Sequence, residues 1–483
     1  MTLSALRLSL ASTLVPLLSA CPNPADDPVE TTLGEHPSES TSSDIDMVES
    51  SSEGRAESSS DGSSDSGGPV PTECPEPSAG PTMHPGNNVE TDEVWTADGS
   101  PHLVPYDFTI HARVVIEPCA RVQLGESLTL TVADGGELVA EGEAALPIVF
   151  ERLGDERWTA IRLYGGTASF AHAIIDGGGR TGNTETDLTG ALLVRGRAGV
   201  TAPDGTLAVS HVEIRGAQSP GVRLDGFGGF TADSDALTVT GGDSHPISAA
   251  ATVVGTIPVG SYSGNGDDRI VLTTASNEVI STDATMRDHG LPYLVGLPGQ
   301  IGDLRVQAAS GLATLTIEPG VELQFTRESV FHIHHGGGDL PATGALVAIG
   351  TQDAPILLTS AEDEPMAGDW LGLSFGGGTL AASTRIDYTT VEYAGGASPS
   401  GSNSCPYPEL PINDAAVRIL GVPPGAFITN TSLLASAGHG IDRGWRDDLV
   451  VEMLASNDYD VLGCRQTVSR MEDGSCPEPV PCD

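Results

Sequence analysis

The sequence predicts an all-β domain built from two tandem copies of one unit, placed behind an N-terminal leader and an acidic tether. Three observations predict this organisation: an apolar leader that ends in a cysteine, a Ser-, Asp- and Glu-rich stretch after it, and an ordered repetition of short strand motifs through the rest of the chain. The composition agrees, because 60 glycines, 34 prolines and only 4% aromatic residues suit many short strands joined by turns.

The first 20 residues have the length and flanks of a secretory signal peptide. One cation, Arg7, precedes an apolar run from Leu8 to Leu18, which is too short to span a bilayer permanently. The run ends in Leu-Ser-Ala-Cys, which resembles the bacterial lipobox. This resemblance implies cleavage before Cys21 and lipidation of its thiol, so that two or three acyl chains anchor the protein. Pro22, where an Asp would signal inner-membrane retention, favours the outer membrane of the bacterial cell envelope. An ordinary signal peptide with a chance cysteine is the alternative.

Residues 21–86 form the predicted tether. The stretch SESTSSDIDMVESSSEGRAESSSDGSSDSGG contains almost no large apolar residue, so it cannot bury enough surface to offset its ordering entropy. We therefore expect a disordered spacer that lifts the domain off the membrane. The whole chain has a formal net charge of -44 and contains no lysine, which argues against a nucleic acid partner.

The chain has seven cysteines, and acylation of Cys21 leaves an even number for disulfides in an oxidising compartment. The six remaining candidates are Cys74, Cys119, Cys405, Cys464, Cys476 and Cys482. Because six cysteines allow about 15 connectivities, sequence alone does not fix the pairing. Sequence proximity and the repeat layout favour Cys74–Cys119, Cys405–Cys464 and Cys476–Cys482. A structural zinc site is the competing interpretation, but no close Cys-x-x-Cys with histidine partners is present.

An internal duplication governs the remaining sequence. VVIEPCARVQL at 114–124 matches LTIEPGVELQF at 315–325, and GELVAEGEAALPIVF at 136–150 matches GALVAIGTQDAPILL at 344–358. Further matched segments follow in the same order in both halves. We assign residues 87–277 to the first copy with a connecting segment, and residues 278–483 to the second copy with a Cys-containing C-terminal end.

Within each copy, apolar and polar residues alternate over short stretches. In HVEIRG, Val212 and Ile214 alternate with Glu213 and Arg215, which indicates strands with one buried face. Two folds bury such strands: a β-sandwich, and a parallel β-helix whose coils stack into one column.

The motifs IEPGVELQF, ALVAIGTQDAPILLTS and IDYTTVEYAGG favour the second fold. They resemble the repeats of bacterial envelope lipoproteins with a right-handed parallel β-helix, a pectin-lyase-like architecture. The similarity covers most of residues 88–460 and implies a right-handed parallel β-helix, or solenoid. The first copy departs from the pattern at Cys119, where the second copy has Gly320. Such a non-glycine residue either tolerates a negative φ or is held by a disulfide, in this case to Cys74.

Three groups of motifs are candidates for functional sites. Gly-His-Gly at 438–440 is similar to a tripeptide of polygalacturonases, but the other motifs of that family are missing. In HIHHGGG at 332–338, His332 and His334 are expected on one strand face, where Asp339 could complete a metal site. Acidic turns at 176–179, 265–269 and 443–448 could bind calcium. In each case a turn or solvent-facing role is the simpler interpretation.

The sequence therefore predicts no catalytic residue, no metal site and no cofactor, with calcium kept as the alternative. Trp158 and Trp370 occupy matching positions in the two copies, which indicates core residues rather than a sugar-stacking platform. We expect a lipid-anchored envelope protein with a non-catalytic structural or binding module for an extracellular glycan or protein. The alternatives are a polysaccharide lyase or hydrolase of the same architecture, and an adhesin-like stalk.

Overall fold

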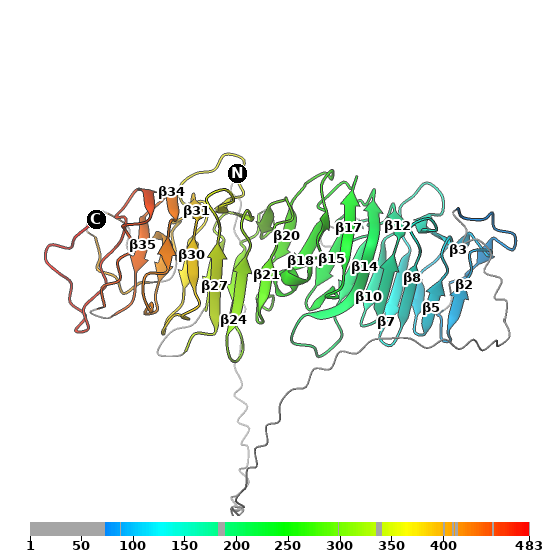
Figure 1. Cartoon of the computed structure of the whole chain (residues 1–483), viewed down its shortest axis with the longest axis horizontal. Coiled ribbons are helices and arrows are strands. Elements are labelled where there is room, and N and C mark those ends of the chain that lie inside the picture. The colour runs from blue at the N-terminus through cyan, green and yellow to red at the C-terminus, as the bar shows by residue number, and fades with distance from the viewer. Residues whose placement is uncertain are drawn as a thin grey trace, which may run out of the picture. The chain divides into compact units, whose positions relative to one another are not determined.

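Short parallel strands stack coil upon coil through the part of the chain that the structure describes (Figure 1). The computed structural model describes residues 73–86, 88–181, 189–297, 299–334, 341–398, 401–407, 410, 414–446 and 449–482. The predicted signal peptide, Cys21 and the tether up to residue 72 lie outside these residues. No helix among the described residues is long and apolar enough to cross a membrane.

The first copy forms three columns, in which each strand pairs in parallel with the strand one coil before it. The first column contains β2 (Glu93–Trp95), β5 (Arg113–Ile116), β8 (Glu137–Glu141), β11 (Thr167–Ala171) and the start of β14 (Asp204–Arg215). The second contains β1 (Thr82–Met83), β3 (His102–Val104), β6 (Arg121–Leu124), β9 (Ile148–Arg152), β12 (Ala173–Asp176) and the end of β14. The third contains β4 (Phe108–Ile110), β7 (Thr129–Ala133), β10 (Ala160–Tyr164), β13 (Leu192–Arg195) and β15 (Val222–Asp225).

The second copy repeats this arrangement column by column. Its first column contains β21 (Ala284–Met286), β24 (Ala313–Ile317), β27 (Gly344–Ile349), β30 (Arg385–Asp387) and β33 (Ile428–Thr429). Its second contains β22 (Tyr293–Val295), β25 (Glu322–Phe325), β28 (Ile356–Ser360), β31 (Thr389–Glu392) and β34 (Ser432–Ser436). Its third contains β23 (Asp303–Val306), β26 (Val330–Ile333), β29 (Gly372–Phe375), β32 (Ala415–Ile419) and β35 (His439–Arg443).

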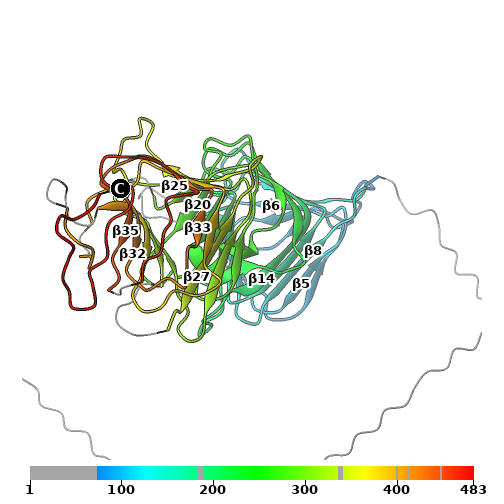
Figure 2. The same ribbon diagram turned by 60° about the vertical axis from the view of Figure 1, so that its left-hand side comes forward.

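The two copies do not stack in phase. The elements between them are β16 (Gly228–Phe230), β17 (Asp235–Thr240), β18 (Ile247–Ala250), the 3-10 helix η1 (Ala251–Thr256), β19 (Gly260–Ser261) and β20 (Ile270–Thr273), and β36 (Asp458–Val461) ends the series. The third column of the first copy continues through β18 and β20 into β22, which begins the second column of the second copy. The second copy is therefore displaced by one column around the stack. Figure 2 shows β5, β8 and β14 side by side along one face of the stack.

Inward-facing aliphatic and aromatic side chains form the core. In β24, Ala313, Leu315 and Ile317 are buried, whereas Thr314 and Thr316 are partly exposed on the other face. Leu346 of β27 is register partner to Leu315, so that the apolar column continues from coil to coil. The long parallel sheets confirm the predicted solenoid over the β-sandwich, which requires two antiparallel sheets packed face to face.

The β domain begins earlier than the predicted boundary at residue 87. Thr82 of β1 pairs in parallel with His102, and a disulfide joins Cys74 to Cys119. The predicted tether extends to residue 86, but this disulfide and the β1 pairing attach residues 73–86 to the first coils. Cys119 has φ +70, close to the +87 of Gly320, so it keeps the left-handed turn and is held by the disulfide.

Two of the three proposed disulfide pairings are wrong. Cys74–Cys119 forms, but Cys405 is bonded to Cys476 and Cys464 to Cys482. The reason is that the C-terminal segment folds back along the chain near Cys405. The Cys405 amide donates to Val468 O at 2.7 Å, and Ser404 forms an antiparallel bridge with Ser469. This antiparallel pairing carries the chain on toward Cys476 beside Cys405, and leaves Cys464 for the C-terminal tail.

Candidate functional site

The Gly-His-Gly motif has a structural role. His439 is 2% exposed, and its Nδ1 accepts a hydrogen bond from the Cys464 amide at 3.0 Å. Burial lowers the pKa of His439, although the carboxylates of Asp442 and Asp414 oppose this shift. The motif therefore fastens the last coil to the disulfide-bonded C-terminal segment.

The histidines of the second motif separate at the end of β26. His332 lies on the strand, and its Nδ1 is 2.8 Å from Oδ1 of Asp303. His334 follows the strand with φ +52, and its Nδ1 is 2.7 Å from the hydroxyl of Thr343. The expectation that both histidines share one face is therefore wrong, because the left-handed residue turns the chain at the corner. His335 and Asp339 lie outside the described residues.

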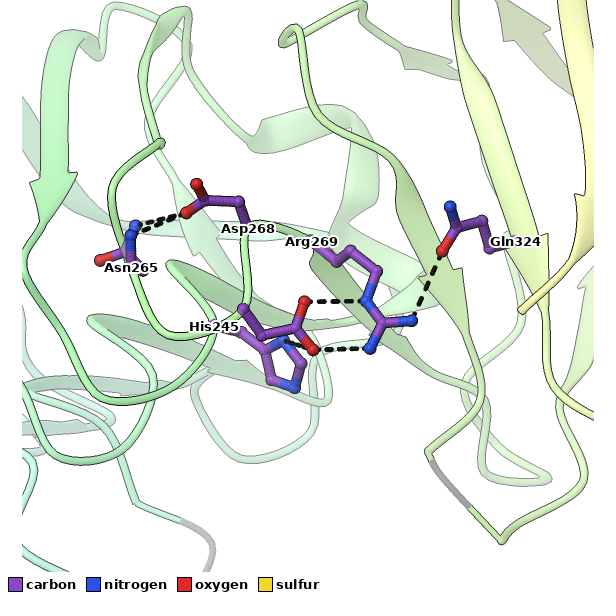
Figure 3. Close-up of polar contacts among 6 residues, drawn as sticks. His245, Asn265, Asp268, Arg269 and Gln324 are labelled. Atoms are coloured by element: carbon purple, nitrogen blue, oxygen red, sulfur yellow. Dashed lines mark hydrogen bonds and ion pairs between the residues drawn. The ribbon is translucent and has the colours of Figure 1, made fainter. Parts of the chain in front are cut away.

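The acidic turn at 265–269 is held together by its own polar groups (Figure 3). Asp268 accepts hydrogen bonds from the backbone amides of Gly264 and Asn265, and the Asn265 side chain donates to Val239 O and Tyr262 O. Asp267 pairs with Arg269 at 2.6 Å.

The described residues of the other two acidic turns also show no cation site. In the turn at 176–179, Asp176 pairs with Arg215. In the turn at 443–448, Asp447 and Asp448 lie outside the described residues. In the described part of the chain, no group of three or more His, Cys, Asp or Glu side chains is arranged to hold a metal ion.

A groove formed by the second copy and the connecting segment before it gathers polar side chains that the sequence did not place together. One cavity of about 520 Å³ is lined by Arg269, Gln300 and Glu362, among others. A second cavity of about 550 Å³ is lined by Arg305, His332 and Arg418, among others. Ile301, Arg327 and Glu328 line both cavities, which therefore adjoin. We call this combined feature the polar groove.

The first cavity of the polar groove contains paired charges. Arg269 contacts both carboxylate oxygens of Asp267, and its third nitrogen lies 3.4 Å from Oε1 of Gln324 (Figure 3). Arg327, which lines both cavities, contacts Glu362 at 2.8 Å and the buried Asp369 at 3.2 Å. The first cavity is thus lined by guanidinium groups that are paired with carboxylates, and both kinds of group can form planar, two-point hydrogen bonds.

A row of outward-facing side chains on the third column passes the second cavity, and three of its members, Arg305, His332 and Arg418, line that cavity. Each strand contributes one side chain to the row, and consecutive members are register partners: Arg305, His332, Ser374, Arg418 and Asp442. We call this set the outward row. The equivalent row of the first copy reads Thr109, Thr131, Arg162, Leu193 and Arg223. The inward neighbours are apolar in both copies, so the two copies share a scaffold but differ on this outer face.

Asp303 connects two members of the row. Its carboxylate accepts hydrogen bonds from His332 and from Arg305, which precedes His332 by one coil. Burial alone would raise the pKa of Asp303, but these hydrogen bonds outweigh burial and lower the pKa to about 2. Asp303 is therefore ionised at any physiological pH and orients both partners.

The far end of the row is buried beneath the segment that contains Cys405. Arg418 is 1% exposed although it lines the groove, and burial lowers its pKa while Asp442 and Asp414 oppose the shift. Burial raises the pKa of Asp442, whose Oδ1 accepts a hydrogen bond from Thr467 at 3.1 Å. The disulfide-bonded C-terminal segment thus closes this end of the groove.

Sequence reasoning missed the polar groove because its members come from separate coils. Asp303 and His332 lie 29 residues apart, and loops of different length separate the strands. The signal present in the sequence was that the residues at the aligned outward-facing positions of the third column differ between the two copies. Comparison of the chain with protein-family models, with curated proteins and with solved structures gives no significant match.

Proposed function

We propose that this protein is a lipid-anchored component of a bacterial cell envelope that binds an extracellular glycan in the polar groove. The observation that carries the proposal is the joining of two cavities, of about 520 and 550 Å³, by shared residues. Hydroxyl-rich ligands need donors and acceptors at close spacing, and the groove supplies guanidinium, carboxylate and amide groups from several coils. Ile301 is 61% exposed at the junction and offers an apolar contact for a sugar ring.

The lipobox resemblance at Leu18 to Cys21 supports the anchor, and the parallel solenoid is consistent with the envelope lipoproteins that the repeat motifs resemble. Lipidation and an outer-membrane location belong to this proposal. The groove favours the binding module over the adhesin-like stalk, because a purely structural stalk does not need a concave site with charged side chains. A chain with net charge -44 gains little from electrostatic attraction to nucleic acid, so we propose no such partner.

Binding to a panel of immobilised polysaccharides tests the proposal. We expect retention of the purified residues 73–483 on at least one polysaccharide, and at least a tenfold weaker affinity for Arg327→Ala. Arg113→Ala is the matched control, because Arg113 has similar exposure and pairs with Glu137 on the first copy, away from the groove. Retention on no polysaccharide, or equal weakening by both variants, would contradict a glycan site in the groove.

A further inference from the structure

His172 and His211 occupy the same corner of two neighbouring coils in the first copy. The register pairs on either side, between β11 and β14 and between β12 and β14, place one histidine over the other. Both have a left-handed backbone, with φ +43 and +56. Their rings stack with centroids 4.8 Å apart and with planes inclined at 26°. This separation matches the spacing of about 4.8 Å between adjacent strands, so the two side chains leave the backbone in the same direction.

The turn at this corner explains a polar residue but not two imidazoles in contact. A left-handed φ is adopted most readily by glycine, and after it by residues such as asparagine and histidine. In the second copy the same corner contains Tyr388 and Asn430, with φ +45 and +46. Asn430 there donates a hydrogen bond to Asp387 at 2.8 Å. The fold therefore forms this corner without a pair of histidines.

A chain of hydrogen bonds sets the tautomer of His211. Ser210 donates its hydroxyl proton to Oδ1 of Asp235 at 2.8 Å. Because a hydroxyl has only one proton, its oxygen accepts a hydrogen bond from Nδ1 of His211, which is 3.1 Å away. The lone pair of the neutral ring is then on Nε2. Histidines that bind metal ions usually donate their other ring nitrogen to such an outer partner, which orients the ring.

Both rings can be reached by an ion from solvent. His211 is exposed and His172 is half-buried. The ring nitrogens of His172 have no hydrogen-bond partner among the described residues, and they are not closed off from solvent. At the same corner, the preceding coil has Gly142 and the following coil has Ala236. Neither of these two positions therefore places a long side chain over the histidine pair.

We propose that His172 and His211 bind a divalent transition-metal ion, Cu²⁺ most tightly, through one nitrogen of each ring and with water in the remaining positions. Imidazole suits copper, nickel and zinc, and Cu²⁺ forms the tightest complexes of these ions. Bonds from imidazole nitrogen to metal are about 2.0–2.1 Å long, so two ligating nitrogens lie about 3–4 Å apart. Rings stacked at 4.8 Å reach this spacing when each tilts slightly about its side-chain bonds.

This pair is a simpler site than a group of three or more His, Cys, Asp or Glu side chains, which the described residues lack. It lies on the first copy and does not depend on glycan binding in the polar groove. The formal net charge of -44 also favours cations near the surface of the protein.

Titration of the purified, untagged protein with CuCl₂, followed by electron paramagnetic resonance, tests the site. We expect a bound Cu²⁺ ion whose spectrum shows coupling to two imidazole nitrogens. His172→Asn and His211→Asn should each remove one nitrogen and weaken binding at least about tenfold, because the second ligand on the same surface adds a factor of this order or more. Asparagine is the chosen replacement because Asn430 adopts the same backbone in the second copy, so both variants should fold.

Two further variants distinguish a built site from a chance contact. Ser210→Ala removes the partner of Nδ1 of His211, and we expect about tenfold weaker binding of Cu²⁺. His111→Gln, at an exposed histidine elsewhere in the first copy, should leave the two-nitrogen spectrum unchanged. An excess of Ca²⁺ or Mg²⁺ should not displace the copper, because these ions prefer oxygen ligands.

A spectrum with coupling to fewer than two nitrogens overturns the proposal without reference to any variant. A two-nitrogen spectrum that survives in both asparagine variants also overturns it, because the copper then lies at other histidines. Retention on polysaccharides is measured separately and should be the same in both variants. Failure of the metal site and failure of the proposed glycan binding are therefore distinguishable.

Discussion

Trp158 and Trp370 make the same hydrogen bond in the two halves of the molecule. The indole of Trp158 donates to Asp176 O at 3.1 Å, and that of Trp370 donates to Glu392 O at 2.8 Å. The acceptors are the last residues of β12 and β31, which are equivalent strands. Both indoles are fully buried, which confirms that they are repeated core residues. The duplication therefore extends from the order of the strands to individual polar contacts in the core.

Replacing either tryptophan with phenylalanine should destabilise the protein. The substitution removes one hydrogen bond, worth about 1 kcal/mol net, and leaves the acceptor carbonyl buried with space beside it. We expect a loss of about 1–3 kcal/mol in the free energy of unfolding for Trp370→Phe, measured by urea denaturation. Tyr106→Phe, at an exposed side chain, should change stability by less than about 0.5 kcal/mol. Equal effects of the two substitutions would contradict the core role of Trp370.

The disulfide arrangement predicts a distinctive tryptic map without reduction. Cleavage after arginine gives peptides 386–418, 447–465 and 471–483, and the last of these contains both Cys476 and Cys482. Because Cys405 is bonded to Cys476 and Cys464 to Cys482, all three peptides should be recovered as one linked species. Pairing by sequence proximity would instead give a linked pair of peptides 386–418 and 447–465, with an internal disulfide in 471–483.

Loss of the disulfide at the C-terminal end should be costly. The paired substitution Cys405→Ser with Cys476→Ser opens a loop with a sequence separation of 71 residues. Removing a native disulfide typically lowers the free energy of unfolding by about 2–5 kcal/mol. We expect a loss in this range, together with faster proteolysis of the C-terminal segment than of the first coils. Unchanged proteolysis would show that this disulfide does not fasten the segment.

The sequence predicted the parts of the fold that depend on local pattern. Alternation such as that of Val212 and Ile214 assigns inward and outward positions within a strand, and those two residues are buried as expected. The matched motifs identified equivalent strands in the two copies. To predict contacts between coils, the residue register between neighbouring strands must also be known. Loops of variable length make this register impossible to read from the sequence. For this reason the pairing of Cys405 and the meeting of Asp303 with His332 became visible only in the structure.

The sequence also did not predict that the second copy is displaced by one column around the stack. It arises in the connecting region, where η1 replaces a strand and β20 leads into β22. The sequence presented residues 265–269 only as an acidic turn, and it did not show that Asn265 joins separate coils through Val239 O and the Gly242 amide.

Asn265 should therefore be critical for stability at the junction of the copies. Its amide nitrogen donates to Val239 O and Tyr262 O, and its amide oxygen accepts from the Gly242 amide. Asn265→Ala leaves these backbone groups without partners, and we expect a loss of about 2–4 kcal/mol in urea denaturation. Asn277→Ala serves as control, because Asn277 is exposed. A loss below about 1 kcal/mol would mean that water or a shifted turn replaces the asparagine.

Acid should destabilise the first coils through His84 and His102. His84 Nε2 lies 3.0 Å from Nδ1 of His102, and the His84 ring packs on Trp95 with centroids 4.2 Å apart. Burial, then repulsion by His102, lowers the pKa of His84 from 6.5 to about 4, although Glu93 opposes the shift. The folded state thus binds fewer protons than the unfolded state between these values. Stability from the neutral ring is present above about pH 6.5 and is lost as the pH falls toward 4.

We expect the midpoint of urea unfolding, followed by tryptophan fluorescence, to decrease steadily from pH 7 to pH 4. His84→Gln can still donate to Nδ1 of His102 but has no titrating group, so its decrease over this range should be smaller. His111→Gln is the control, because it removes a histidine from an exposed position and should leave the pH dependence unchanged. If His84→Gln and the unmodified protein lost stability in parallel, protonation of His84 would not be the cause, and the carboxylates that titrate below pH 5 would account for the loss instead.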